Sequence, residues 1–278
     1  MHIQPFYLGG DLTAERSTTV LEASAGTGKT FALAGLVTRY IAEGVAALDQ
    51  MLLITFSRSA SQELRERVRA QIVSALAAID DPERAANELE RHICATDRPA
   101  RRLRLHDALA GFDAATIATT HQFCHIVLKS LGVAGDSDSG VTLVESLDEL
   151  VVEIVDDLYL THFGMQRDDP VLGYRAALKL AREVVNHPAT QLRPVDPEPD
   201  SYAAVCLAFA RDVLAELEIR KRRSGILGYD DLLTRLAAAL DRPDSAARVR
   251  MPQRWPIVMV DEFQDTDPVQ WQVIERAF

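Results

Sequence analysis

Short apolar, β-branched runs alternate with longer amphipathic segments along the chain. Four such runs predict strands, at residues 18–21, 51–56, 115–119 and 256–260. The last run is apolar throughout, so we expect it to be buried on both faces. A helix should run from Thr30 to about Gly44, and a long helix should follow Ser59–Gln62, which fits a capping box. This alternation predicts an α/β fold around a parallel sheet.

Two stretches between these strands have helical patterns and no convincing strand. Residues 80–112 are polar and rich in alanine and arginine, and residues 141–250 contain helices expected at 146–163, 202–223 and 231–240. Four prolines make 186–200 a loop. We therefore predict a sheet domain over 1–79, 113–140 and 251–278, with a large helical insertion formed by 80–112 and 141–250.

The composition limits the class of protein. Hydrophobic residues make up 47% and charged residues 26%, and no apolar run approaches the roughly 20 residues of a membrane span. The N-terminus lacks the features of a signal peptide, and three widely spaced cysteines without a CxxC pair predict reduced thiols in a cytoplasmic protein. A net charge of −11 argues against general coating of nucleic acid but leaves a local DNA track open.

Basic residues gather in short clusters. Arginines recur at 65–69 and 98–104, and four basic residues occupy 220–223. Each cluster also fits a solvated helix side or a helix C-terminus, where cations offset the helix dipole. We interpret them as structural and not as a specific nucleic-acid site.

Residues 23–30 carry the clearest chemical pattern. They read Ala23, Ser24, Ala25, Gly26, Thr27, Gly28, Lys29 and Thr30, which fits a phosphate-binding loop with alanine in place of the first glycine. The glycines let backbone N–H groups curl around a phosphate. Lys29 would reach the β- and γ-phosphates, Thr30 would offer a hydroxyl to Mg²⁺, and the helix that follows would point its positive end at the anion. The pattern predicts ATP and Mg²⁺ as cofactors.

A second pattern lies near the end of the sequence. The apolar run 257–260 leads into Asp261 and Glu262, where Asp261 can hold Mg²⁺ and Glu262 can polarise an attacking water. Alone, this is also an ordinary acidic turn after a strand. Lys29 and Asp261 are 261 − 29 = 232 positions apart, a spacing that favours a motor with an inserted domain over a compact kinase.

Five segments, in order, resemble motifs of the UvrD/Rep/RecB group of superfamily 1 DNA helicases. Residues 21–30 resemble motif I, 54–64 motif Ia, 117–123 motif Ib, 228–233 the Asp-Asp-Leu-Leu segment of the inserted subdomain, and 260–271 motif II. Asp-Pro-Val-Gln-Trp at 267–271 is closest to the RecB branch, the β subunits of exodeoxyribonuclease V. The resemblance implies a RecA-like P-loop NTPase sheet, domain 1A, with a helical insertion, domain 1B.

The resemblance also implies an activity and its residues. It implies ATP-driven 3′→5′ movement on single-stranded DNA in double-strand break repair, with duplex DNA and RecC- and RecD-like subunits as partners. Catalytic roles would fall to Lys29, Asp261, Glu262 and Gln264, and DNA contacts to Thr55, Phe56, Ser57, Thr119 and His121. Hydroxyls and an imidazole can bond phosphates, and an aromatic ring can stack on a base. Phe56 also fits a core aromatic, and His121 a histidine at a helix start.

Nothing in the sequence resembles motifs III to VI of that group. We therefore expect the 278-residue chain to bind nucleotide weakly and not to unwind DNA by itself, an expectation that strong DNA-stimulated ATP turnover would contradict. Two alternatives remain: a non-catalytic ATP- or DNA-binding module derived from such a helicase, and an unrelated P-loop kinase. The kinase predicts no dependence on DNA and leaves the segments at 54–64 and 117–123 without a role.

Overall fold

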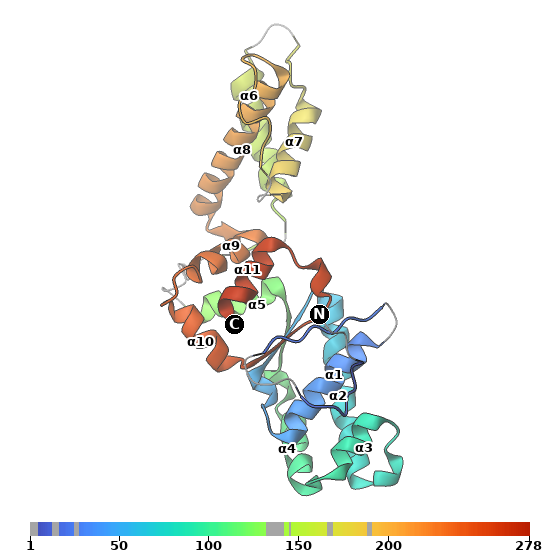
Figure 1. Ribbon diagram of the computed structural model, residues 1–278. Coiled ribbons are helices and arrows are strands. Elements are labelled where there is room, and N and C mark those ends of the chain that lie inside the picture. Colours follow the sequence, from blue (N-terminus) through green and yellow to red (C-terminus); the bar gives the residue numbers. More distant parts are fainter. Residues whose placement is uncertain are drawn as a thin grey trace. The chain divides into compact units, whose positions relative to one another are not determined.

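The computed structural model describes residues 5–12, 17–24, 28–131, 142–144, 146–165, 169–187 and 191–278. The chain forms two compact units (Figure 1): unit 1 is Met1–Leu131 with Leu236–Phe278, and unit 2 is Gly132–Arg235. A parallel sheet and many helices confirm the predicted α/β class. Across the described ranges, no helix is both long and apolar enough to cross a membrane.

Unit 1 is built on a three-stranded parallel sheet. Its strands are β1 (Met51–Thr55), β2 (Thr116–Thr119) and β5 (Ile257–Val260), in the order β2-β1-β5. Every residue of β1 is buried, because β1 has a strand on each side and helices over both faces. Three of the four predicted strands are confirmed. Since the strands are parallel, their carboxyl ends lie at one edge of the sheet.

The strand predicted at residues 18–21 is wrong. Residues 17–24 are described and exposed, and they form no strand; Val20 is 67% exposed. An apolar, β-branched run becomes a strand only where a neighbouring strand accepts its hydrogen bonds. In the described sheet β5 pairs with β1 alone, so its residues are half-buried and not buried on both faces as we expected.

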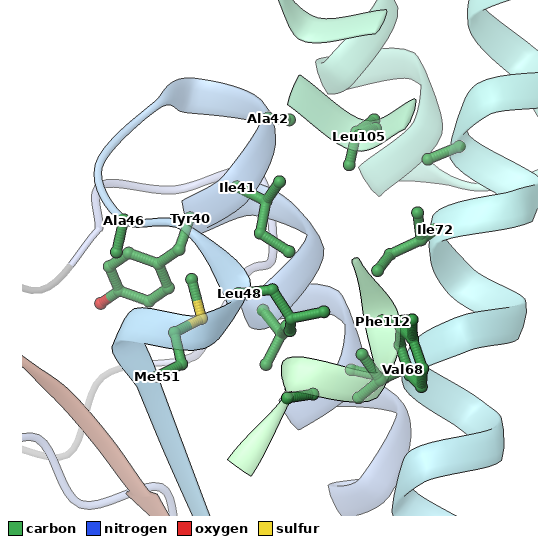
Figure 2. Close-up of a cluster of buried hydrophobic side chains, with 14 of the residues drawn as sticks. Tyr40, Ile41, Ala42, Ala46, Leu48, Met51, Val68, Ile72, Leu105 and Phe112 are labelled. Carbon is green, nitrogen blue, oxygen red and sulfur yellow. The ribbon is translucent and has the colours of Figure 1, made fainter. Parts of the chain in front are cut away.

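Helices cover the two faces of the sheet. Helices α1 (Lys29–Glu43) and α2 (Arg58–Asp80) share a core with alternate strand residues such as Met51 and Leu53, and α5 (Thr120–Leu131) packs against β1 and β2. Figure 2 shows this core, where side chains of α1 and α2 point toward one another. The labelled members are Tyr40, Ile41, Ala42, Ala46, Leu48, Met51, Val68, Ile72, Leu105 and Phe112.

The ends of these two helices follow from the sequence. As predicted, α1 stops at Gly44, whose φ of 76° is a left-handed conformation that glycine adopts without strain. Helix α2 begins earlier than the predicted capping box at 59–62. Its N-cap is Ser57, and the Ser57 hydroxyl accepts a hydrogen bond of 3.1 Å from the Ala60 N–H.

Residues 80–112 pack within unit 1, although we had grouped them with the insertion. They form α3 (Glu88–Ala95) and α4 (Arg98–Ala110). Leu89, Ile93 and Leu105 are almost completely buried in the core shared with α1 and α2. A few apolar side chains per helix are enough to fix two largely polar helices to a core, so the compact units divide the chain differently from the predicted parts.

Arginines on and near these helices hold main-chain carbonyls. Arg101 donates to the carbonyls of His92 and Ile93 at 2.8 and 3.1 Å, near the end of α3. Arg104 donates to the carbonyl of Ala42, near the end of α1, at 2.8 Å. These bonds satisfy carbonyls that a helix end leaves without an intrahelical partner. The structural interpretation is confirmed for these two arginines.

Unit 2 is mainly three helices, α6 (Asp148–Phe163), α7 (Tyr174–Asn186) and α8 (Tyr202–Ser224). They share an apolar core that includes Ile154, Ala181 and Phe209. We predicted no strand here, but β3 (Thr142–Leu143) pairs in parallel with β4 (Ile226–Leu227). A pair of two-residue strands is too short to give a sequence pattern. The described residues of the predicted loop 186–200 contain no strand, and helix only at their first residue, where α7 ends.

The remaining helices are α9 (Tyr229–Ala239), α10 (Ala246–Arg254) and α11 (Pro268–Ala277). Helix α11 starts as predicted, with Asp267 as N-cap and Pro268 as the first residue. The Asp267 carboxylate accepts hydrogen bonds from the N–H groups of Val269 and Gln270, at 2.7 and 2.9 Å. This cap fixes the start of α11, whose first residue comes eight positions after the end of β5.

The three cysteines are free, and we expect them to differ in reactivity. Cys124 is fully buried in α5, and burial raises the pKa of its thiol to about 12. At pH 8 only about one Cys124 side chain in 10⁴ would be the reactive thiolate. We expect two thiols of the native chain to react with a disulfide reagent and the third only after unfolding in urea. Equal rates for all three thiols would contradict this prediction, and mass spectrometry identifies the protected cysteine.

Candidate functional site

The start of α1 carries the described end of the predicted phosphate loop. Ala23 and Ser24 are exposed, whereas Ala25, Gly26 and Thr27 lie outside the described residues. Gly28 is the N-cap of α1 and has a φ of 93°, a conformation that strains any residue with a Cβ. Lys29 and Thr30 then form the first turn, both half-buried. The first turn contains no acidic side chain that would repel an anion.

The two carboxylates follow the carboxyl end of β5. The Asp261 N–H donates to the carbonyl of Ile54 at 2.8 Å, which extends the pairing of β5 with β1 by one residue. Glu262 has a φ of 51°, so the chain turns sharply directly after the strand. The Glu262 N–H donates to the Asp261 carboxylate at 3.0 Å. The backbone of Asp261 is therefore fixed by the end of β1, and the backbone N–H of Glu262 is held by the Asp261 carboxylate.

Lys29 and Glu262 form an ion pair. The Lys29 Nζ lies 2.7 Å from the Glu262 Oε2, with exposed side-chain fractions of 28% and 36%. Gln264 also donates to the Glu262 Oε2 through its side-chain amide. The fold thus brings together three of the four predicted catalytic residues through direct bonds, across 233 positions of sequence. Asp261, the fourth, is the neighbour of Glu262.

The charges in this cluster shift one another. The hydrogen bond from Lys29 holds the pKa of Glu262 below its ordinary value, and the same bond raises the pKa of Lys29. The ion pair is therefore complete at neutral pH, and it is lost as acid protonates Glu262 or as strong alkali deprotonates Lys29. Burial raises the pKa of Asp261, and the charge of Glu262 adds to that effect. A bound cation would offset both causes at Asp261.

The donor set fits magnesium bound together with a nucleotide. Across the described residues, no three acidic, histidine or cysteine side chains gather as a self-sufficient metal site. Mg²⁺ commonly keeps several waters and takes one or two carboxylates plus phosphate oxygens. The half-buried carboxylate of Asp261 and the hydroxyl of Thr30, next to Lys29, match that requirement.

The predicted DNA-facing residues occupy the same edge of the sheet. Thr55 and Thr119 are paired at the carboxyl ends of β1 and β2. Phe56, directly after β1, is 61% exposed, so it is not a core aromatic. His121 is half-buried in the first turn of α5. The register of two parallel strands therefore brings the two segments together.

Two of these residues do not face outward. Thr55 is 1% exposed, and its hydroxyl bonds the Ser57 carbonyl at 3.2 Å and the Ser61 hydroxyl. Thr119 is 6% exposed, and its hydroxyl accepts the Gln122 N–H at 3.3 Å. Both threonines sit inside because the side chains that end a buried strand are themselves buried. Their position argues for a supporting role in place of the direct DNA contact that we expected.

Ser61 was missed as a member of this edge. It lies in the first turn of α2 and is 7% exposed, and its hydroxyl contacts the hydroxyl of Thr55. A serine four residues after the N-cap of an amphipathic helix, on the side that faces the strand, was the available signal.

The comparison with protein families decides the family. The sequence pattern of the UvrD/REP helicase N-terminal domain matches residues 11–278. The chain belongs to this family. Membership excludes the unrelated P-loop kinase that the phosphate loop alone left open.

Relatives of this UvrD/REP-family chain carry names that agree with the match. The RecBCD enzyme subunit RecB of Mycolicibacterium smegmatis is 80% identical over 273 residues, which is 98% of this chain and 25% of the relative. The subunit of the same name from Mycobacterium tuberculosis H37Rv is 63% identical over 276 residues, again 98% and 25%. The ATP-dependent DNA helicase UvrD2 of Mycobacterium bovis is 28% identical over 274 residues, 94% and 32%. The chain spans about a quarter of the length of the RecB relatives that it matches.

Proposed function

We propose that this UvrD/REP-family chain binds ATP–Mg²⁺ and supplies one wall of the ATPase site of a RecB-like 3′→5′ DNA helicase. The contact between Lys29 and Glu262, at 2.7 Å, is the observation that carries the proposal. It joins the phosphate loop to the acidic turn after β5, as a nucleotide site between them requires. The RecB names of the two most similar reported relatives support the assignment to that branch.

Each residue of the cluster has a chemical role in this proposal. The backbone of 23–30 and the positive end of α1 hold the phosphates, and Lys29 moves from Glu262 to the β- and γ-phosphates. Thr30 and Asp261 hold the metal, which offsets negative charge on the phosphates. Glu262, once released from Lys29, orients and polarises the attacking water. Gln264, which bonds Glu262, keeps that carboxylate in place.

DNA would pass along the carboxyl edge of the sheet. Phe56 offers an exposed ring to a base, and Ser57 and His121 lie at the same edge. Thr55 and Thr119 support this edge from inside. Because Asp261 bonds the carbonyl of Ile54, the residue before Thr55, the nucleotide and DNA contacts share the end of one strand.

The wider assignment follows the named relatives. In this proposal the sheet is the RecA-like domain 1A, and the three-helix unit 2 belongs to the helical insertion 1B. The partners are single-stranded and duplex DNA together with RecC- and RecD-like subunits, as the RecBCD name of the relatives indicates. Double-strand break repair in the cytoplasm is the corresponding process.

Removal of the Lys29 amine tests the nucleotide site. We expect Lys29→Ala to weaken binding of Mg²⁺-ATP by about 10- to 100-fold, because a charged hydrogen bond to a polyphosphate is lost. Titration of a fluorescent ATP analogue into the 278-residue chain measures this. Lys129→Ala is the matched control, since Lys129 is an exposed lysine on α5 in the same unit. Equal affinities for the native chain and Lys29→Ala would refute the site.

A further inference from the structure

Two buried hydroxyls meet where β1 turns into α2. Thr55 ends β1 with 1% exposure, and Ser61 lies in the first turns of α2 with 7% exposure. Their oxygens are in direct hydrogen-bond contact. Each hydroxyl oxygen also lies within hydrogen-bond distance of the Ser57 carbonyl oxygen, Thr55 at 3.2 Å and Ser61 at 3.1 Å. Since each hydroxyl has one proton, one of them donates to the other and the second donates to that carbonyl.

These bonds fix the backbone on both sides of Phe56. Thr55 precedes the ring and is tied to α2, whereas Ser57 follows it and is the N-cap of that helix. The Ser57 carbonyl also accepts a hydrogen bond from the Ser61 N–H at 2.9 Å. Because both neighbours are anchored, the backbone of Phe56 has little freedom, although its side chain is 61% exposed.

Phe56 therefore presents an exposed aromatic ring from a fixed backbone. A ring that is held in place loses less conformational entropy when a flat partner stacks on it. The base of a single-stranded nucleic acid is a flat partner of this kind.

We propose that the Thr55–Ser61 hydroxyl pair positions Phe56 for stacking on a base of single-stranded DNA. The pair touches no DNA itself and acts through the ring, so Thr55 and Ser61 are positioning residues. The inference rests on the proposed function, and it assigns Ser61 a role and Thr55 a different role from direct phosphate contact.

A double-mutant cycle separates positioning from simple support of the fold. In it, Phe56→Ala, Ser61→Ala and the double variant of the 278-residue chain are titrated with a fluorescent oligo-dT, and 2-aminopurine in the oligonucleotide reports stacking. We expect Phe56→Ala to weaken binding about 5- to 150-fold, the range for loss of one stacked base. Ser61→Ala should weaken it about three- to tenfold, and the double variant should bind no more weakly than Phe56→Ala alone.

Three controls make the cycle decisive. Ser59→Ala removes an exposed hydroxyl of the same turn, whose oxygen lies 2.9 Å from that of Ser57, and should leave DNA binding unchanged. Thr55→Ser keeps the buried hydroxyl and should bind like the native chain, whereas Thr55→Val should behave like Ser61→Ala. Mg²⁺-ATP affinity should be the same in all of these variants, which shows that the sheet edge is still folded.

The outcomes distinguish the two proposals. Two outcomes would contradict the positioning role. In the first, Ser61→Ala weakens DNA binding by the same factor whether residue 56 is phenylalanine or alanine. In the second, Phe56→Ala lowers DNA binding and 2-aminopurine stacking, but Ser61→Ala changes neither. If Phe56→Ala itself changes nothing, the stacking role in the proposed function fails. The Lys29→Ala titration tests nucleotide binding, and its result does not depend on the positioning role or on the stacking role.

Discussion

Replacing Glu262 by glutamine should tighten ATP binding several-fold and lower ATP turnover by about 10²–10⁴-fold. Glutamine cannot take a proton from the attacking water, so turnover falls in any assembly that hydrolyses ATP through this site. Binding changes in the opposite direction because Lys29 no longer has to leave an ion pair at 2.7 Å to reach the phosphates. The loss of a carboxylate also removes repulsion between Glu262 and the polyphosphate.

The two effects are measured separately. Titration of a non-hydrolysable ATP analogue gives the affinity, and phosphate release in the presence of single-stranded DNA gives the turnover. Glu275→Gln is the matched control, because it removes the same charge from an exposed position on α11 and should change neither quantity. Weaker binding by Glu262→Gln would show that the Lys29–Glu262 pair does not compete with the nucleotide.

High salt provides a second check on the competition. Screening weakens an ion pair between half-exposed side chains. It also weakens attraction between Lys29 and the phosphates, so native affinity alone is ambiguous. The attraction between Lys29 and the phosphates is present in both chains, so its salt dependence cancels in the ratio of the ATP affinity of Glu262→Gln to that of the native chain. We expect that ratio to approach one as salt rises, and a ratio independent of salt would contradict the ion-pair explanation.

The chemistry of the site could be read from local sequence, but its contacts could not. A glycine-rich loop before a helix and two carboxylates after an apolar strand are local patterns, and they named Lys29, Asp261 and Glu262. That Lys29 bonds Glu262 depends on the strand order β2-β1-β5, which no local pattern encodes. The order places the end of β5 beside β1, and the folded sheet then brings the acidic turn to the start of α1.

The same limit explains why the sequence did not distinguish the buried threonine at the end of β1 from the exposed residue after it. Thr55 and Phe56 were both expected to face DNA because both lie in one resembling segment. In the structure the buried strand includes Thr55 and ends there, so successive side chains point to opposite environments. A shift of one position therefore decides whether a side chain at this edge is buried or exposed. The sequence locates a strand end to within a few residues only.

Two segments pack differently from what their local sequence suggested, for a common physical reason. Residues 18–21 have the composition of a strand but no partner in the described sheet, and residues 80–112 have a polar composition but a few deeply buried side chains. In both segments tertiary contacts override local preference. The helices α1, α6 and α8 were placed within about two residues at each end, because each buries apolar side chains in a core.

Replacing Trp255 by alanine should destabilise unit 1 by about 3–5 kcal/mol, the usual cost of removing a large buried aromatic side chain. Trp255 is 1% exposed, and its ring meets that of Phe123 edge-on with centroids 5.7 Å apart. Its indole N–H donates to the Thr116 hydroxyl at 3.2 Å. The residue therefore joins the segment before β5 to both β2 and α5.

The second tryptophan supplies the control. Trp271 lies on α11, is 42% exposed and meets the Phe263 ring edge-on at 5.4 Å, so Trp271→Ala should cost about 1 kcal/mol or less. Both tryptophans belong to unit 1, so the one that remains in each variant reports urea unfolding of that unit by fluorescence. Far-UV circular dichroism follows both units, which need not unfold together.

Trp255→Phe refines the cause of the loss. Phenylalanine keeps most of the buried ring but cannot donate to Thr116, so the variant should lose about 1 kcal/mol for the hydrogen bond and a further part for the smaller ring. An equal loss for Trp255→Ala and Trp271→Ala would mean that burial of Trp255 does not hold β5 against the sheet. Because Asp261 and Glu262 directly follow β5, that result would also remove the physical basis for the preformed nucleotide site that we propose.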